Sequence, residues 1–274
     1  MNVLSKEKQI TVIGSLAEGS SIRSIERITG IHRDTIMRLG VHVGNACQEM
    51  LDKKMRGLNC RSIEVDEIWG FIGKKKAHAS TIDRRSGLGD VWTFVSIDPE
   101  TKLMPSFLVG KRDRYHAIQF MEDLAGRLNN RIQLSTDALR AYPDAVEIAF
   151  GADIDYGQIV KEYASPARED QRKYSPAMLV AVYKSVVNGV PNPSKVCTSY
   201  IERANLTMRL HCKRLARLTL AFSKKFENFR AAVALHFAYY NFVKTHGSLR
   251  CTPAMAAGIE STHLTVENLI KFAA

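Results

Sequence analysis

The sequence has 274 residues, of which 45% are hydrophobic and 24% are charged, and these ordinary values exclude disorder as the main state of the chain. The length predicts one large domain, with room for a small appendage. Lysine and arginine number 39 against 28 acidic residues, a formal net charge of +11 that favours a polyanionic partner such as DNA. Composition alone is almost as compatible with a solvated basic surface that has no partner.

The sequence contains no run of about 18 apolar residues, so we expect no membrane-spanning helix. Its charged N-terminus lacks the apolar stretch of a secretory signal. The five cysteines form no CxxC pair, which indicates reduced, buried thiols in a reducing compartment. We therefore expect a cytoplasmic protein with no membrane partner.

The N-terminal region, residues 1–58, predicts three helices. Apolar residues recur at helical spacing over residues 6–18 and 22–29, and a longer helix is expected to begin near Arg33. A turn that contains Gly30 separates the second and third helices, an arrangement typical of a helix-turn-helix. The serines just before residue 22 are suited to cap the second helix.

This pattern predicts that the start of the third helix enters a major groove of DNA. The N-terminal residues of such a helix contact bases, and here Arg33 and Arg38 would face the DNA. The alternative is a small helical bundle with charged outer faces. The basic composition favours DNA binding of the two.

After residue 60 the pattern changes from helical to extended. Residues 62–73 are rich in β-branched and aromatic side chains, and two further strands are expected over 91–97 and 103–109. The linker between these two strands contains Asp98-Pro99, a turn signal. The three segments predict a meander of three strands.

The next segments alternate between the two kinds of structure. We expect an amphipathic helix over 114–128, a strand over 131–136, a helix at about 139–149 and a strand at about 154–163. The predicted order of elements is therefore βββαβαβ, which indicates an α/β fold.

Residues 164–198 interrupt this alternation with four prolines and are interpreted as an insertion or lid loop. A long helix is expected from Tyr200 to about Leu220, followed by an apolar helix from about Phe226 to Val243.

Three acidic residues have positions that suggest chemistry. Asp66 lies within the first strand, Asp137 lies just past the fourth strand, and Glu202 lies in the first turn of the long helix. In this order of elements the first and fourth strands are neighbours, and the later helix can bring a third carboxylate beside them. Converging carboxylates bind hard divalent cations such as Mg²⁺ or Mn²⁺, and two such ions can promote hydrolysis of a phosphate ester.

Each acid also has a simpler explanation. Asp66 could line a solvated strand face with Glu64 and Glu67, Asp137 could cap the following helix, and Glu202 could offset a helix dipole. Each simple explanation is favoured for its residue taken alone. Their joint occurrence on this order of elements favours the metal site.

The helix that carries Glu202 is also basic. Arg209 and Lys213, at +7 and +11, are each expected about 20° from Glu202 on a helical wheel, which suits a metal ligand beside phosphate-binding cations. Arg203 and Arg217 add to the positive charge of a helix that would line DNA. A solvated helix face is the alternative.

Several segments resemble a known family. Residues 200–209, Tyr-Ile-Glu-Arg-Ala-Asn-Leu-Thr-Met-Arg, resemble the glutamate-bearing motif of bacterial insertion-sequence DDE transposases. Residues 65–70 and 135–142 resemble the strands with the two aspartates of that family, and residues 239–254 resemble its C-terminal signature. The four motifs occur in the family's order and span most of residues 60–258.

The resemblance implies an RNase H-like catalytic domain (βββαβαβα) over residues 60–258, preceded by the helix-turn-helix and followed by a tail over 259–274. It implies that Asp66, Asp137 and Glu202 bind two Mg²⁺ or Mn²⁺ ions. The implied activity is cleavage of transposon ends and joining of those ends to target DNA, by a homo-oligomer assembled on DNA in the bacterial nucleoid.

Two other functions remain open at this point. One is a catalytically inactive DNA-binding regulator derived from a transposase, which the presence of all three acids disfavours. The other is a nuclease without strand transfer. The sequence contains no GxxxxGK[ST] loop, so ATP is not expected as a cofactor.

Overall fold

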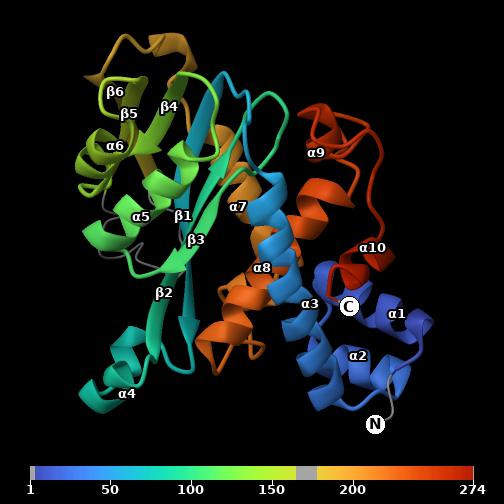
Figure 1. Ribbon diagram of the computed structural model, residues 1–274. Helices are drawn as coiled ribbons and strands as arrows, with labels where there is room; N and C mark the ends of the chain where they lie inside the picture. The colour runs from blue at the N-terminus through green and yellow to red at the C-terminus, as the bar shows by residue number, and fades with distance from the viewer. Residues whose placement is uncertain (1–3, 165–177, 274) are drawn as a thin grey trace.

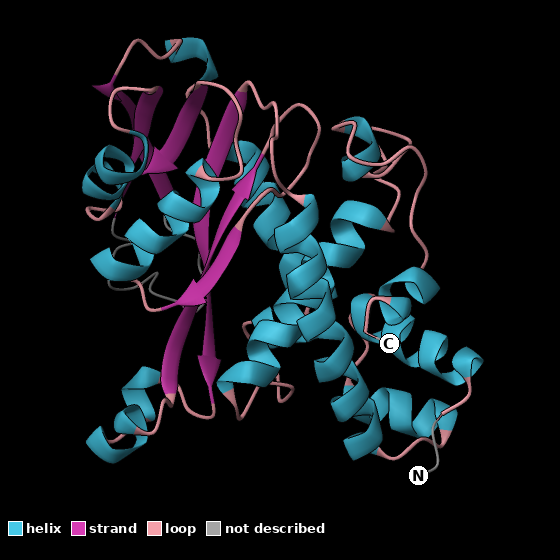
Figure 2. Cartoon of the chain, in the orientation of Figure 1, coloured by secondary structure: helices cyan, strands magenta, loops and turns pink. Residues whose placement is uncertain are grey.

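The computed structural model describes residues 4–164 and 178–273, which form a mixed α/β structure with a six-stranded sheet (Figures 1 and 2). The longer helices and the strands have the following bounds: α1 (Lys6–Ala17), α2 (Ile22–Thr29), α3 (Arg33–Lys54), β1 (Ser62–Ile72), α4 (Thr81–Arg85), β2 (Gly89–Ile97), β3 (Phe107–Gly110), α5 (Arg114–Ala125), β4 (Ile132–Asp137), α6 (Tyr142–Phe150), β5 (Ile154–Ala164), β6 (Met178–Asn188), α7 (Ser199–His211), α8 (Phe226–Phe242), α9 (Pro253–Ala256) and α10 (Val266–Lys271).

The strand order in the sheet is β3-β2-β1-β4-β5-β6. Strands β1, β2 and β3 pair antiparallel as a meander, β4 pairs parallel with β1 and with β5, and β6 pairs antiparallel with β5. The prediction that the first and fourth strands are neighbours is therefore confirmed. Helix α4 lies at the far end of the long β1–β2 hairpin (Figure 1).

Side chains alternate between the two faces of the sheet, and helices cover both. Phe94 of β2 packs against Phe120 of α5 and Tyr142 of α6 on one face. On the other face, Asp66 of β1 accepts a hydrogen bond from Asn205 of α7. This alternation decides which acidic side chains of β1 point toward which helices.

The three predicted N-terminal helices are present as α1, α2 and α3. Ser21 caps α2 by accepting a hydrogen bond from the Ser24 amide at 3.1 Å, and Gly30 ends that helix in a left-handed conformation. Val12, Ile25 and Ile36 are fully buried in a small apolar core of their own. The local sequence thus sets both the helices and the turn between them.

The N-terminal helices pack directly against the rest of the chain. Helix α3 lies along α8, where Gly44 approaches so closely that a Cβ atom would lie 2.3 Å from the Ala231 carbonyl oxygen. The C-terminal helix α10 contacts α1 and α3, and Lys6 forms an ion pair with Glu267 at 2.7 Å. The segment predicted as a tail therefore contains a helix that packs on the N-terminal region.

One predicted loop contains a strand. Residues 178–188 form β6, although residues 164–198 were expected to be a loop because of their prolines. The run from Met178 to Asn188 itself contains no proline and is rich in valine, which favours a strand. The remaining part of the predicted insertion, residues 165–177, lies outside the described residues.

The predicted long helix after residue 199 is shorter than expected. Helix α7 ends at His211, and a short 3₁₀ turn follows at Lys213–Leu215. Cys212 adopts an extended conformation, and the turn buries Leu215 in the main core. The third strand is also shorter, since it begins at Phe107 after Pro105, a residue that cannot donate a ladder hydrogen bond. No helix in the described part of the chain is long and apolar enough to cross a membrane.

Candidate active site

Two of the predicted acids lie side by side because of the sheet topology. In the parallel pairing of β1 with β4, Val65 is opposite Thr136, so the next residues, Asp66 and Asp137, are adjacent. Asp66 is held by two hydrogen bonds, from the Glu67 amide at 2.8 Å and from Asn205 Nδ2 at 2.8 Å. Asp137 Oδ1 accepts a hydrogen bond from the Leu139 amide at 3.0 Å.

A third carboxylate, Glu67, completes the acidic cluster of Asp66, Glu67 and Asp137. Each of these residues offers a carboxylate oxygen, and the three oxygens lie within 4.8 Å of one another. The sequence interpretation treated Glu67 only as a reason to doubt Asp66. Glu67 could have been recognised as a candidate ligand because it follows Asp66 directly in a strand whose other residues are mostly buried.

Arg112 lies over the acidic cluster. Its Nε donates to Glu67 Oε2 at 3.0 Å, and its Nη2 approaches Asp137 Oδ2 at 3.5 Å. The guanidinium also lies over the Trp92 ring at 5.0 Å, which fixes its position. Glu67 Oε1 is buried beside the Tyr142 hydroxyl, and neither atom makes a hydrogen bond of regular geometry among the described residues, so the arginine satisfies only one of the two oxygens.

The protein environment disfavours the ionised forms of these acids. Burial raises the pKa of Asp66 to about 6, and the nearby charges of Asp137 and Glu202 add to the increase. Burial also raises the pKa of Glu67 to about 7, with a further contribution from Asp137. Carboxylates with excess negative charge in a partly dry site are suited to bind a divalent cation, which would neutralise them.

Glu202 lies close to this cluster without being part of it. It occupies the first turn of α7, where its Oε1 accepts a hydrogen bond from the Thr198 hydroxyl at 2.7 Å and forms an ion pair with Lys161 of β5. Glu202 lies about one helical turn before Asn205, which donates to Asp66, and its charge adds to the rise in the pKa of Asp66 that burial causes. The structure thus brings Asp66 and Asp137 together with Glu67, and it leaves Glu202 bound to a lysine nearby.

Arg209 and Lys213 do not share a helix face as predicted. Arg209 is on α7 with Glu202, but Lys213 lies beyond the end of α7, so its predicted place on that helix is wrong. The helix ends early because the following turn buries Leu215. Arg209 Nη1 donates to the Leu215 carbonyl at 2.7 Å and to the Trp69 carbonyl at 3.4 Å, and it thereby holds the turn against β1.

The other predicted DNA-binding residues lie on the surface. Arg33 and Arg38 are exposed at the start of α3, and Arg217 is exposed in the chain that follows α7. Arg203 is exposed on α7 and lines a cavity of about 360 Å³ together with Lys102 and other residues. All four side chains are therefore accessible, and their contact with DNA stays a prediction.

Comparison with known proteins gives one family match. Residues 181–242 match the model of the IS1 transposase family, a segment that includes α7 with Glu202 but neither Asp66 nor Asp137. No curated protein matches the sequence. A solved piggyBac transposase, described as a synaptic complex with hairpin DNA, is 10% identical over 100% of this chain and 71% of that chain, with a TM-score of 0.42. That similarity is too weak to carry a conclusion, and the family match supports a transposase.

Proposed function

We propose that this protein is a DNA transposase of the DDE type, with an RNase H-like core and an N-terminal helix-turn-helix. The observation that carries the proposal is the pairing of β1 with β4, which brings Asp66 and Asp137 together, while the hydrogen bond from Asn205 ties α7, the helix that carries Glu202, to Asp66. The family match over α7 and α8 supports the same function independently of these two aspartates.

The residues of the site fit a divalent metal centre. Three carboxylate oxygens lie within 4.8 Å of one another, and a buried oxygen of Glu67 has no partner among the described residues. Asp66, Asp137 and Glu202 would hold two Mg²⁺ or Mn²⁺ ions, and Glu67 is a further candidate ligand. When bound, such ions supply Lewis-acid activation of a water molecule and stabilise the leaving oxygen of a phosphodiester.

The remaining residues position the ligands and the DNA. Asn205 and the Glu67 amide orient the Asp66 carboxylate, and Arg112 limits the negative charge of Glu67 and Asp137. The exposed arginines of α3 bind the element ends. Hydrolysis leaves a 3′-OH at the end of the element, and this hydroxyl then attacks a target phosphodiester without a covalent enzyme intermediate.

The experiment uses a plasmid in which the DNA flanking the gene supplies the element ends. The purified protein with Mg²⁺ should cut at the ends and join them to a target plasmid, whereas EDTA should abolish both products. Metal binding is tested separately by replacing Mg²⁺ with Fe²⁺ and generating hydroxyl radicals, which should cleave the protein chain near Asp66 and Asp137. Cutting without joining would identify a nuclease, and the absence of chain cleavage would contradict the metal site.

One observation favours a second candidate, a DNA-binding regulator that has lost catalysis. Lys161 forms an ion pair with Glu202, so the ammonium already neutralises the carboxylate that a metal would need. A regulator would bind the element ends and show neither Mg²⁺-dependent cleavage nor chain cleavage by Fe²⁺. In a Lys161→Ala variant the regulator would stay inactive, whereas a transposase would retain its metal site.

DNA recognition by α3 has its own test. Arg33→Ala and Arg38→Ala should each weaken binding to the element ends, because both side chains are exposed at the start of α3. Arg61→Ala is a matched control, since its side chain is 84% exposed and lies outside the helix-turn-helix. Unchanged binding in both α3 variants would contradict this role.

A further inference from the structure

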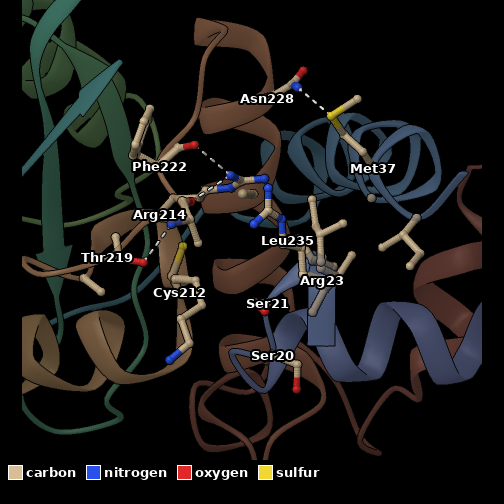
Figure 3. A pocket seen from close by; sticks show the side chains of 18 of the residues that line it. Ser20, Ser21, Arg23, Met37, Cys212, Arg214, Thr219, Phe222, Asn228 and Leu235 are labelled. Atoms are coloured by element: carbon tan, nitrogen blue, oxygen red, sulfur yellow. Dashed lines mark hydrogen bonds between the residues drawn. The ribbon is translucent and has the colours of Figure 1, made fainter. Parts of the chain in front are cut away.

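A large pocket lies between the N-terminal helices and the chain that follows α7. It has a volume of about 750 Å³, and Figure 3 shows it between Ser20, Ser21 and Arg23 on one side and Cys212, Arg214 and Thr219 on the other. Helix α8 forms its floor through residues such as Asn228 and Leu235. We call it the basic pocket. It has the size of sites that bind small molecules or single nucleotides.

The basic pocket is strongly positive. Five of its described lining residues are arginine or lysine, against one acid, Asp34; the five are Arg23, Arg27, Arg33, Lys213 and Arg214. Three of these cations belong to α2 and α3, and two belong to the turn after α7, about 180 residues later in the sequence. The two groups therefore line one pocket only in the folded protein. Such an arrangement favours an anionic group, and phosphate is the anion that arginine forks bind well.

The interior of the basic pocket is apolar and its wall is fixed. Ile36, Met37, Phe222 and Leu235 line it. Arg214 Nη1 donates to the carbonyls of Ala221 at 2.8 Å and Phe222 at 3.2 Å, and these bonds hold the loop that carries Phe222 (Figure 3). A flat apolar group with a phosphate attached matches this combination of surfaces.

His236 supplies an independent sign of a ligand. It lines the basic pocket, it is only 4% exposed, and both of its ring nitrogens lack a hydrogen-bond partner among the described residues. Buried polar groups are normally paired, so two unpaired nitrogens require an explanation. Burial lowers the pKa of His236 to about 3, so the ring is neutral and offers one donor and one acceptor. The edges of nucleobases carry both kinds of partner.

We infer that the basic pocket binds one unpaired nucleotide of a DNA strand, with its phosphate on the arginines of α2 and its base against Leu235 and His236. This inference rests on the proposed function, since it assumes that the protein binds DNA. A base inside a duplex cannot enter a pocket, so the nucleotide must be extruded or lie in a single strand. The pocket would then couple binding by the N-terminal helices to the chain that follows α7.

The test measures binding of the full-length protein to labelled DNA in EDTA, where no cleavage occurs. Three otherwise identical duplexes are compared: one fully paired, one with a single unpaired nucleotide next to the element end, and one with an abasic residue at that place. We expect about tenfold tighter binding of the unpaired nucleotide than of the other two, since a base that needs no unpairing avoids a cost of a few kcal/mol. Equal binding of all three duplexes would overturn the inference.

Three variants test the residues. His236→Phe should reduce the preference for the unpaired base about fivefold, the value of one net hydrogen bond, without lowering thermal stability because it removes unpaired polar atoms. His236→Asn keeps a donor and an acceptor and should recover part of the preference. Arg27→Ala should weaken binding of all three duplexes and reduce the salt dependence by about one charge, whereas the control Arg61→Ala should not.

Other outcomes separate this inference from the proposed function. If the paired duplex is bound and cleaved but the unpaired base gives no preference, only the basic pocket is misassigned. If His236→Phe folds and keeps the full preference, the base lies elsewhere and the inference is overturned. If free deoxynucleoside monophosphate competes as strongly as the strand with the unpaired base, the site takes a small molecule and not a strand. Absence of all DNA binding would remove both proposals.

Discussion

The acidic cluster and the basic pocket differ in how their residues are brought together. Asp66 and Asp137 meet because β1 and β4 are neighbouring parallel strands, and their separation follows from strand register. Arg33 and Lys213 line the same pocket because α3 packs on α8 and because the chain turns after α7. Both regions contain a buried polar atom without a partner among the described residues, Glu67 Oε1 in one and the His236 nitrogens in the other.

This difference shows which sites depend on topology and which depend on packing. A site set by strand register tolerates small movements of the surrounding helices, because the ladder hydrogen bonds hold its residues. A site set by helix packing is sensitive to any change that moves one helix against another. The predictions below test this distinction, beginning with the largest expected effect.

The three predicted metal ligands, Asp66, Asp137 and Glu202, should be indispensable for cleavage. Asp66→Asn, Asp137→Asn and Glu202→Gln each remove a ligand charge and little volume. Each should lower the cleavage rate by more than about 100-fold, since even residues that only support a metal ligand are worth about 10- to 100-fold. Binding to DNA in EDTA should stay unchanged. Glu122→Gln, an exposed acid on α5, is the matched control. A variant that cleaves at the rate of the unmodified protein would exclude that residue as a ligand.

The acidic cluster should also make stability depend on pH in the absence of metal. Burial raises the pKa of Asp66 to about 6 and that of Glu67 to about 7. At these two carboxyls the folded protein keeps protons that the unfolded chain releases, so their contribution to the free energy of unfolding should decrease as the pH rises from about 4 to about 7. Buried His236 contributes in the opposite direction over part of this range, because its pKa is lowered to about 3. One pKa unit corresponds to about 1.4 kcal/mol, and we expect the Asp66 carboxyl to account for a decrease of about 1 to 3 kcal/mol.

Denaturant unfolding across this pH range measures the effect. Asp66→Asn should remove the contribution of Asp66, so the stability of this variant relative to the unmodified protein should increase as the pH rises. Mg²⁺ should restore stability at the alkaline end by binding the ionised carboxylates. The control Glu122→Gln should leave the slope unchanged. If the difference in stability between the unmodified protein and Asp66→Asn did not change with pH, Arg112 would neutralise the cluster more completely than the raised pKa values imply.

Helix packing should control the basic pocket and leave the acidic cluster in place. Gly44→Ala places a methyl group against the Ala231 carbonyl and should lower the free energy of unfolding by about 1 to 3 kcal/mol. Gly14→Ala is the matched control, because its Cβ would lie 3.9 Å from Val266 in ordinary contact, and alanine favours a helix by up to about 1 kcal/mol. Binding of the unpaired nucleotide should weaken in Gly44→Ala only. Equal stability of the two variants would show that α3 and α8 can move apart freely.

The sequence predicted the parts of the fold that local patterns determine. The N-terminal helices and the adjacency of Asp66 to Asp137 follow from periodicity and the order of elements, and both are present. Glu67 was overlooked, since a regular strand directs it to the face opposite Asp66. Asp137, however, lies at the end of β4, beyond the last residue pair with β1, and there its carboxylate comes within reach of Glu67. Strand β6 was overlooked because flanking prolines obscured a run of valines.

The end of α7 could not be predicted from local sequence. The segment after His211 contains good helix formers and neither glycine nor proline before residue 220, so helical propensity continues through it. Burial of Leu215 in the main core and the hydrogen bond from Arg209 to the Trp69 carbonyl are long-range contacts that override this propensity. The same override moved Lys213 from the predicted helix face to the basic pocket.

Arg209 and Lys213 provide the last test of the difference between the acidic cluster and the basic pocket. The sequence predicted that both bind phosphate, whereas in the structure Arg209 holds backbone carbonyls and Lys213 lines the basic pocket. Arg209→Ala leaves the Trp69 and Leu215 carbonyls without their donor and should lower the free energy of unfolding by about 1 to 3 kcal/mol. Arg209→Lys should recover part of this loss, because both bonds come from the single nitrogen Nη1 and one ammonium can also donate to two carbonyls. Lys213→Ala removes an exposed side chain and should change stability by less than about 0.5 kcal/mol.

DNA binding should separate the same two residues in the opposite direction. Lys213→Ala should reduce the salt dependence of binding by about one charge, because its ammonium lines the basic pocket and faces solvent. Arg209→Ala, measured at a temperature where it is folded, should keep the salt dependence of the unmodified protein, because its Nη1 is engaged by backbone carbonyls. If Arg209→Ala instead loses one charge of salt dependence with unchanged stability, Arg209 is a phosphate clamp beside Glu202. Arg209 would then bind DNA beside the acidic cluster, and phosphate binding would not be confined to the basic pocket.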